Sequence, residues 1–114
     1  MGGVFIFGQK ISFNKTTHDY GVLKYKADGK TTFVVENKGD KPLILTGVKA
    51  ACGCTTPKWD SNPILPGKTS VIEVGYDTAL SGSFKKLIEV YSNDPDAGRS
   101  VLWIKGEVEA NKSK

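Results

Sequence analysis

The two cysteines of this chain, Cys52 and Cys54, are separated by a single glycine and are its most reactive side chains. In a regular strand, residues two apart point to the same face, and their Cα atoms lie roughly 6.5–7 Å apart, near the upper limit for a disulfide. A turn at Gly53 would shorten that distance, because glycine adopts turn conformations at little steric cost. A local disulfide is therefore feasible, and its short loop predicts little added stability and easy reduction.

Three interpretations of this pair stay open. The favoured one is structural, with the cysteines either packed as small apolar side chains or joined in the local disulfide. Thiol-redox chemistry would need a lowered thiol pKa, for which Lys49 or Lys58 could supply positive charge, although redox motifs usually open a helix and none is expected here. Thiolates also suit Cu(I) or Zn, but tetrahedral zinc needs four ligands, and the chain adds only a distant His18 and Met1. We therefore expect no cofactor and assign no metal ligand.

Two other polar clusters invite chemical interpretations. His18 and Asp19 are adjacent, but no serine in a nucleophile-elbow context accompanies them, and Cys52 is far away in the sequence. We expect His18 to be a packed strand histidine rather than a catalytic base. The acidic and amide residues at 93–96 could suggest a calcium loop, but a turn built by Asp and Asn side chains with proline is favoured. The sequence therefore predicts no catalytic residue and no enzyme.

The tryptophans suggest binding instead. In the last expected strand, the alternation that buries Leu102 and Ile104 turns Trp103 outward beside Val101. Together with Trp59 these residues form a candidate interaction surface, because exposed apolar patches mark binding sites. The alternative, weighed almost equally, is that Trp103 covers lysine stems or an adjacent loop. If Trp103 serves binding, the Trp103→Ser variant is expected to keep nearly all of its thermal stability.

Short strands and turns must position all of these side chains. Glycine is frequent, with 13 in the chain, and no long stretch repeats apolar residues with helical spacing. The segment 57–68 holds three prolines, which exclude a central strand; Gly21 is expected to mark a bulge, and Asp28-Gly29 a turn with positive φ. Alternation predicts about seven strands, at residues 10–14, 18–23, 31–37, 43–48, 69–77, 84–92 and 99–108. This pattern is typical of an all-β, Ig-like β-sandwich with two antiparallel sheets.

A chain of 114 residues with 39% hydrophobic residues suits one domain, which we place at residues 10–108. Residues 1–9 are expected to be a disordered leader, either a non-native start or the remnant of an export signal, and residues 109–114 a disordered tail. No apolar run approaches the roughly 18 residues of a membrane-spanning helix. The net charge is +4, but the bases are scattered lysines with Arg99 as the only arginine, which argues against nucleic-acid binding.

Six short motifs follow one another between Ile11 and Val108. They are His18-Asp19-Tyr20-Gly21, Phe33-Val34-Val35-Glu36-Asn37-Lys38-Gly39, Pro42-Leu43, Ala51-Cys52-Gly53-Cys54-Thr55, Leu65-Pro66-Gly67-Lys68 and Tyr91-Ser92-Asn93-Asp94-Pro95. As a set they resemble a bacterial family catalogued as domain of unknown function fifteen-seventy-three. The resemblance implies an Ig-like sandwich akin to Hydin-type and major-sperm-protein-type domains, in an exported protein with no established activity. His18 stands where an aromatic residue is common, so its ring is expected to pack.

Residues and resemblance together lead to two hypotheses. The leading one is a non-catalytic Ig-like module, periplasmic or otherwise in the bacterial envelope or outside the cell. Its partners would be unidentified proteins or other envelope components, with no nucleic acid bound and no membrane insertion of the mature domain. The alternative is a thiol-redox or Cu/Zn-handling protein centred on Cys52 and Cys54.

Overall fold

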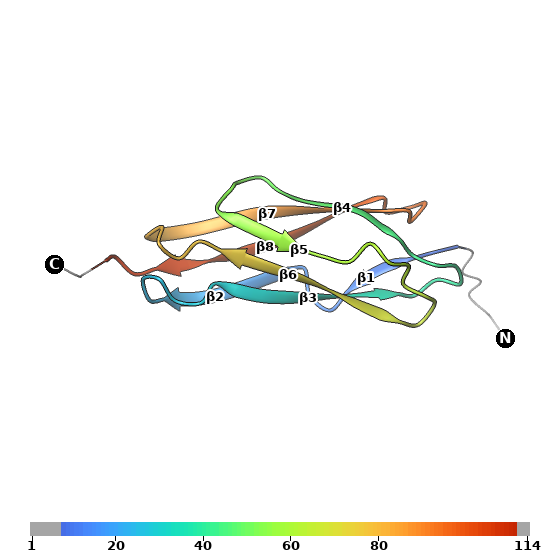
Figure 1. Ribbon diagram of the computed structural model, residues 1–114, viewed down its shortest axis with the longest axis horizontal. Helices are drawn as coiled ribbons and strands as arrows, with labels where there is room; N and C mark the ends of the chain where they lie inside the picture. The colour runs from blue at the N-terminus through green and yellow to red at the C-terminus, as the bar shows by residue number, and fades with distance from the viewer. Residues whose placement is uncertain (1–7, 112–114) are drawn as a thin grey trace.

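The computed structural model describes residues 8–111, which fold into two packed four-stranded β-sheets (Figure 1). Sheet I has the strand order β1-β3-β6-β5, and sheet II the order β2-β8-β7-β4. No helix long and apolar enough to span a membrane occurs among residues 8–111. The strands are β1 (Ile11–Phe13), β2 (Thr17–Leu23), β3 (Lys30–Asn37), β4 (Leu45–Ala50), β5 (Thr55–Lys58), β6 (Thr69–Tyr76), β7 (Gly82–Ser92) and β8 (Arg99–Val108). The predicted all-β sandwich is confirmed.

The strand that sequence analysis missed is β5, directly after the cysteines. It contains Pro57, the first proline of the segment 57–68. A proline is tolerated there because β5 lies at the edge of sheet I and pairs only with β6, so one row of its N–H groups needs no partner. Beyond Lys58 the chain is irregular until β6, apart from one isolated bridge between Leu43 and Ile64.

The core lies between the sheets and consists of inward-facing residues of β3, β4, β6, β7 and β8, together with Leu43 and Ile64 of the isolated bridge. Burying one such aliphatic or aromatic side chain contributes about 1.5–3 kcal/mol, so this alternating pattern is what holds the two sheets together. The rings of Tyr76 and Phe84 stack across the sandwich with their centroids 3.7 Å apart. Every residue that alternation places inward is buried: Phe33, Val35, Ile72, Val74, Tyr76, Phe84, Ile88, Val90, Leu102, Ile104 and Val108.

On each lateral side of the sandwich, one continuous segment crosses from one sheet to the other. Residues 14–16 join β1 of sheet I to β2 of sheet II, and residues 51–54 join β4 of sheet II to β5 of sheet I. Each edge strand therefore covers only part of its neighbour: β1 pairs with residues 35–37 of β3, and β4 with residues 88–92 of β7. The strand β2 pairs with β8 in parallel, whereas the other ladders are antiparallel.

Two glycines have clear conformational roles. Gly21 has a φ of 68° and lies where the register between β2 and β8 shifts, so the predicted bulge is present. The turn before β3 differs from the prediction, because its positive φ of 63° belongs to Lys26 and not to Gly29. A Cβ at Gly29 would lie 2.2 Å from the backbone oxygen of Tyr76. Close approach of two chain segments, and not a positive φ, therefore requires glycine at this position.

Contacts to the sandwich begin before the first strand and continue past the last. The Gly8 N–H donates to Asp40 Oδ1 at 2.5 Å, and the side chain of Gln9 donates to a backbone oxygen after β7. At the other end, the Glu109 N–H donates to the Leu23 carbonyl at 2.8 Å. Residues 8, 9 and 109 thus bond to the domain, although they fall in the predicted leader and tail. Residues 1–7 and 112–114 of those two segments lie outside the described residues.

Candidate functional site

Cys52 and Cys54 are joined by a disulfide in the loop between β4 and β5. Their Cα atoms are 5.2 Å apart, closer than in a regular strand, because the chain turns at Gly53. The Cys54 N–H donates to Cys52 Sγ at 3.2 Å, and the Thr55 N–H donates to the Cys52 carbonyl at 3.1 Å. Both cysteines are only partly buried. The pair therefore lies at the surface within a loop that its own backbone hydrogen bonds hold in shape.

Backbone hydrogen bonds also attach this loop to both sheets. At its start, the Ala51 N–H donates to the Leu87 carbonyl of β7 at 3.4 Å. At its end, the Asp77 N–H donates to the Cys54 carbonyl at 2.9 Å. The disulfide therefore closes the short segment that carries the chain from sheet II to sheet I.

The two lysines that could activate a thiol have other neighbours. The Lys49 ammonium lies 5.7 Å from the centroid of the Tyr91 ring. Lys58 lies opposite Glu73 in the ladder between β5 and β6. The side-chain neighbour of Cys54 Sγ is the hydroxyl of the next residue, Thr55, at 3.7 Å. Nothing in these contacts favours the redox alternative over the structural one.

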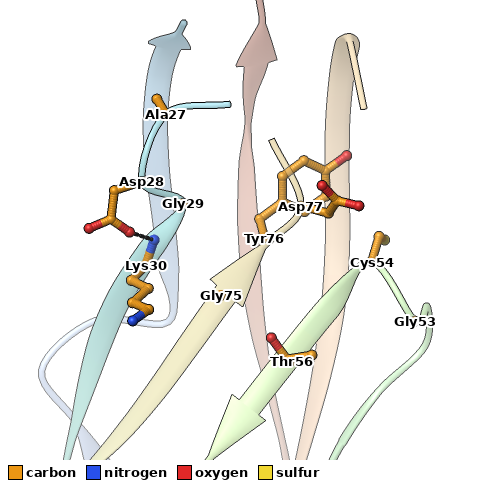
Figure 2. A pocket seen from close by; sticks show the side chains of 10 residues that line it. All are labelled: Ala27, Asp28, Gly29, Lys30, Gly53, Cys54, Thr56, Gly75, Tyr76 and Asp77. Atoms are coloured by element: carbon orange, nitrogen blue, oxygen red, sulfur yellow. Dashed lines mark hydrogen bonds between the residues drawn. The ribbon is translucent and has the colours of Figure 1, made fainter. Parts of the chain in front are cut away.

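A hollow beside the disulfide opens on the outer face of sheet I (Figure 2). Its floor is Gly75, which lies between Lys30 of β3 and Thr56 of β5 in the two ladders. The hollow has a volume of about 340 Å³, and a Cβ at Gly75 would lie 3.1 Å from Thr56 Oγ1. The other lining residues are Ala27, Asp28, Gly29, Gly53, Cys54, Tyr76 and Asp77.

The hollow offers hydrogen-bonding groups but no catalytic arrangement. Its two carboxylates, one ammonium group and two hydroxyls could hold a small polar molecule, and no nucleophile is held against a base within it. The Asp28 carboxylate is engaged locally, since it accepts the Lys30 N–H at 2.9 Å. This hollow was not predicted from the sequence; its signal is a glycine in the outward-facing row of a strand.

His18 is not brought near the cysteines. It lies on β2, whereas the disulfide follows β4, and these two strands are the opposite edges of sheet II. The His18 ring contacts Tyr20 edge-on, with centroids 4.6 Å apart, and its Nδ1 lies 2.8 Å from Lys15 Nζ. Burial first, and the Lys15 charge second, lower the pKa of His18, while Asp19 opposes them. Across the described residues, no three His, Cys, Asp or Glu side chains are grouped so that they could hold a metal ion.

The acidic turn after β7 binds backbone groups. Asp94 is buried, and its carboxylate accepts the N–H groups of Ile11 at 2.9 Å, Asp96 at 2.8 Å and Ala97 at 3.0 Å. Burial raises the pKa of the Asp94 carboxyl, but the three backbone donors outweigh burial and hold the pKa below its ordinary value. These contacts are those of a turn built by an Asp side chain, which also ties the first strand to the end of β7.

The outer face of sheet II carries a partly exposed aromatic cluster. Trp103 and Val101 of β8 point outward, and the ladder places Leu87 of β7 opposite Trp103. We call the partly buried side chains of Leu87, Tyr91, Val101 and Trp103 the Trp103 face. The Lys85 ammonium lies 4.8 Å from the centroid of the Trp103 ring, so a lysine does cover part of the tryptophan, as the alternative interpretation expected.

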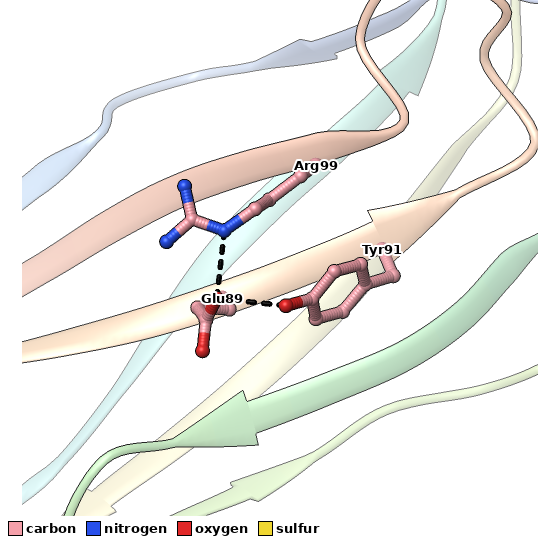
Figure 3. A network of polar contacts seen from close by, with 3 residues as sticks. All are labelled: Glu89, Tyr91 and Arg99. Carbon is pink, nitrogen blue, oxygen red and sulfur yellow. Dashed lines mark hydrogen bonds and ion pairs between the residues drawn. The ribbon is translucent and has the colours of Figure 1, made fainter.

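Polar contacts border this face at its other end (Figure 3). Glu89 Oε2 accepts the Tyr91 hydroxyl and the Arg99 Nε–H, both at 2.7 Å. The bond from Tyr91, followed by the bond from Arg99, lowers the pKa of Glu89. Trp59 lies elsewhere: it follows β5 of sheet I and packs, partly buried, against the core. The structure therefore unites Val101 and Trp103 on one surface but does not place Trp59 there.

Residues 11–108 match the model of a family described as a protein of unknown function, DUF1573. The chain belongs to the DUF1573 family. This confirms the resemblance drawn from the six motifs, and the Cys-Gly-Cys motif of this DUF1573 domain is the disulfide loop described above. No curated protein matches the sequence.

Solved structures similar to this DUF1573 domain share its fold. A Porphyromonas gingivalis protein of unknown function superposes with a TM-score of 0.80 at 23% identity, over 91% of this chain and 49% of that one. A Caenorhabditis elegans major sperm protein family member gives 0.56 at 14% identity, over 86% and 96%. The Pseudomonas aeruginosa CupB2 chaperone gives 0.63 at 13% identity, over 90% and 57%. The chain thus spans about half of the P. gingivalis protein, and at these identities the likeness establishes the Ig-like fold alone.

The disulfide makes a direct prediction about thiol content. We expect alkylation of the folded, unreduced protein to label no cysteine, and alkylation after unfolding and reduction to label both. Replacing both cysteines with serine is expected to lower the free energy of unfolding by only about 1–2 kcal/mol, because closing so short a loop removes little chain entropy. Two reactive thiols before reduction would contradict the first expectation, and failure of the double variant to fold would contradict the second.

Proposed function

We propose that this domain is a non-catalytic protein-binding module of the bacterial envelope and that it binds its partner through the Trp103 face. The observation that carries the proposal is the position of the cluster. Leu87 and Trp103 lie opposite each other on β7 and β8, the two inner strands of sheet II, and both remain partly exposed. Side chains at such positions face solvent unless another molecule covers them.

The two outer faces of the sandwich differ in a way that supports this choice. On the inner strands of sheet I, the comparable outward pairs are Val34 with Val71 and Thr32 with Glu73. Sheet II instead presents tryptophan, tyrosine and leucine in one cluster, with Arg99 at its border. Protein interfaces are enriched in aromatic residues and arginine, and Trp, Tyr and Arg are the residues that most often dominate binding energy.

The fold neighbours support the same class of function. One of them is a chaperone, and chaperones act by binding other proteins. The sites described above support binding over catalysis, since the cysteines are joined, His18 lies at the opposite edge of sheet II and the hollow holds no nucleophile against a base. The sites on the surface of this domain therefore fit a protein-binding role better than an enzymatic role.

The disulfide supports the proposed location. Disulfides persist in oxidising compartments such as the periplasm and are rare in the cytosol. Fractionation of the source cells, with the thiol state recorded in each fraction, tests this proposal. Oxidised protein in the envelope or periplasmic fraction would support it, and reduced protein confined to the cytosol would overturn it.

The binding proposal is tested by a pair of variants on opposite faces. We expect Trp103→Ser to reduce capture of envelope proteins by the immobilised domain about tenfold or more, because a central aromatic anchor contributes over 1.4 kcal/mol. Val71→Ser is the matched control, since Val71 is an exposed apolar residue on the outer face of sheet I. Both variants are expected to lose less than about 1.5 kcal/mol of unfolding free energy, because neither side chain lies in the core.

Two results would contradict the proposal. One is unchanged capture by Trp103→Ser, which would show that the Trp103 face is not the contact surface. The other is a large drop in melting temperature for Trp103→Ser, which would assign Trp103 to stability and favour the covering role of Lys85. The same captured envelope proteins are quantified for wild type, Trp103→Ser and Val71→Ser.

A further inference from the structure

The first half of β7 has an open backbone edge. β7 begins at Gly82 and pairs with β8 along residues 82–91, but β4 pairs only with its residues 88–92. The β4 chain then turns away into the disulfide loop and continues as β5 in the other sheet. Among the described strands, none lies beside residues 82–86 on the β4 side. We call these five residues the β7 margin.

The direction of the hydrogen-bonding groups in the β7 margin follows from Leu87, the residue that comes directly after it. The Leu87 carbonyl accepts the Ala51 N–H at 3.4 Å, so the backbone groups of Leu87 point toward the β4 side. Successive residues of an antiparallel strand direct these groups to alternate sides. Ser83 and Lys85 therefore present their N–H and C=O groups to the same open side, and both residues are exposed. An extended chain could bond to these groups without displacing any part of the domain.

Charge indicates what kind of chain fits. Lys85 and Lys86 point to opposite faces of the margin, and Lys105 of β8 lies directly opposite Lys85. Like charges at directly opposite positions destabilise a sheet, so an acidic group placed beside them would relieve repulsion. Two acidic residues are near in the ladders: Asp19 pairs with Lys105 at 4.0 Å, and Glu107 lies opposite Ser83. Lys85 itself contacts the Trp103 ring.

The same charges argue against a second copy of this chain as the occupant. Two β7 margins paired antiparallel would bring Lys85 and Lys86 of one copy against the same lysines of the other. The repulsion would then be doubled instead of relieved. On an added partner strand, acidic residues on the outward face would meet Lys85. Apolar residues on its inward face would meet the side of the sandwich where Phe84 is buried.

We propose that the β7 margin receives an extended segment of a partner protein in which acidic and apolar residues alternate, added to sheet II as a strand in line with β4. This inference rests on the proposed protein-binding function and names the chemistry and the binding mode of the partner. It uses main-chain bonds at the margin, whereas the earlier test concerns side chains of the Trp103 face.

The experiment uses a phage-displayed library of random ten-residue peptides selected on the wild-type domain. We expect the enriched peptides to alternate Asp or Glu with apolar residues. A synthetic peptide of the enriched sequence is expected to slow amide hydrogen exchange at Ser83 and Lys85 about tenfold or more, because each N–H would gain a strand partner. Ser83→Pro removes one of these donors without touching the ladder to β8, and is expected to weaken peptide binding about tenfold.

Ser83→Ala is the matched control, since it keeps the N–H and is expected to bind within about twofold of wild type. If Ser83→Pro does not fold, Lys85→Glu replaces it, with weaker binding of the acidic peptide and stronger binding of its lysine-substituted counterpart. The inference is overturned if no alternating acidic peptide is enriched, if the amides of Ser83 and Lys85 are not protected, or if the enriched peptide binds Ser83→Pro or Lys85→Glu as well as wild type. Because Trp103→Ser capture is measured separately, this failure would leave the proposed function standing.

Discussion

The Asp94→Ala variant is expected to lose about 3–5 kcal/mol of unfolding free energy, since hydrogen bonds to a charged group contribute about 1.5–3 kcal/mol each and unsatisfied buried donors add a penalty. Three backbone N–H groups, those of Ile11, Asp96 and Ala97, lose their acceptor in this variant. For a domain of this size, the melting temperature should fall by roughly 10–20 °C. Urea unfolding followed by circular dichroism measures the free energy directly.

The control for this substitution lies in the same turn. Asp96 is exposed, and the contact it makes with Asp94 uses its backbone N–H, so Asp96→Ala is expected to change stability by less than about 0.5 kcal/mol. Equal effects of the two substitutions would show that the turn needs negative charge in general and not the buried acceptor.

The pH dependence of stability gives the same prediction an independent readout. The native pKa of Asp94 lies below its ordinary value of 3.8, so the unfolded chain binds the proton more readily than the folded one. The stabilisation from Asp94 is therefore fully present above that value and is lost as the pH falls through it toward the native pKa. Asp94→Asn should be less stable than wild type near neutral pH, and the difference should shrink in acid. If the stability difference between Asp94→Asn and wild type stays constant between about pH 6 and about pH 2, the lowered pKa does not belong to Asp94.

The Asn37→Ala variant is expected to lose about 3–4 kcal/mol, because a completely buried amide with four partners disappears. Asn37 Nδ2 donates to the carbonyls of Lys41 at 2.7 Å and Ile64 at 2.8 Å. Its Oδ1 accepts the N–H groups of Gly39 at 2.9 Å and Lys10 at 3.3 Å. One side chain thus holds together the end of β3, the loop that follows it, the bridge at Ile64 and the start of the domain.

Two further substitutions sharpen this second prediction. Asn37→Asp should be at least as destabilising, because it places a buried carboxylate oxygen where two carbonyl oxygens require a donor. Asn62→Ala is the control, since Asn62 is exposed and its side-chain contact is with Asp60; a change below about 0.5 kcal/mol is expected. An Asn37→Ala loss below about 1 kcal/mol would show that water replaces the amide.

Alternation identified the core because burial on one face of a strand is a local property of the sequence. The inward sets of β3, β6, β7 and β8 were all predictable in this way. The strand β5 was not, because Pro57 excludes only a central position and the sequence does not say which strands form the edges. The parallel pairing of β2 with β8 is also invisible locally, since it depends on where residues 17–23 lie relative to the end of the chain.

The candidate sites were less predictable for a related reason. The alternation correctly turned Trp103 outward, but its neighbour Leu87 follows from the register between β7 and β8, which no local pattern specifies. Asp94 and Asn37 were visible as motif residues, yet Asp94 bonds to Ile11 and Asn37 to Ile64, far away in the sequence. The disulfide was predictable as feasible because both of its partners lie in one short loop.

The pairing of β8 has a consequence for the order in which the domain can be assembled. β8 is the last of the described strands, and it is hydrogen-bonded on one side to β7 and on the other to β2. A ribosome makes the chain from its N-terminus, so β2 has no partner in sheet II until residues 103–108 have been synthesised. Completion of sheet II must therefore wait for nearly the whole domain. A domain that cannot complete its second sheet until its synthesis is almost finished is suited to passage through a membrane before it folds, as the proposed envelope location would require.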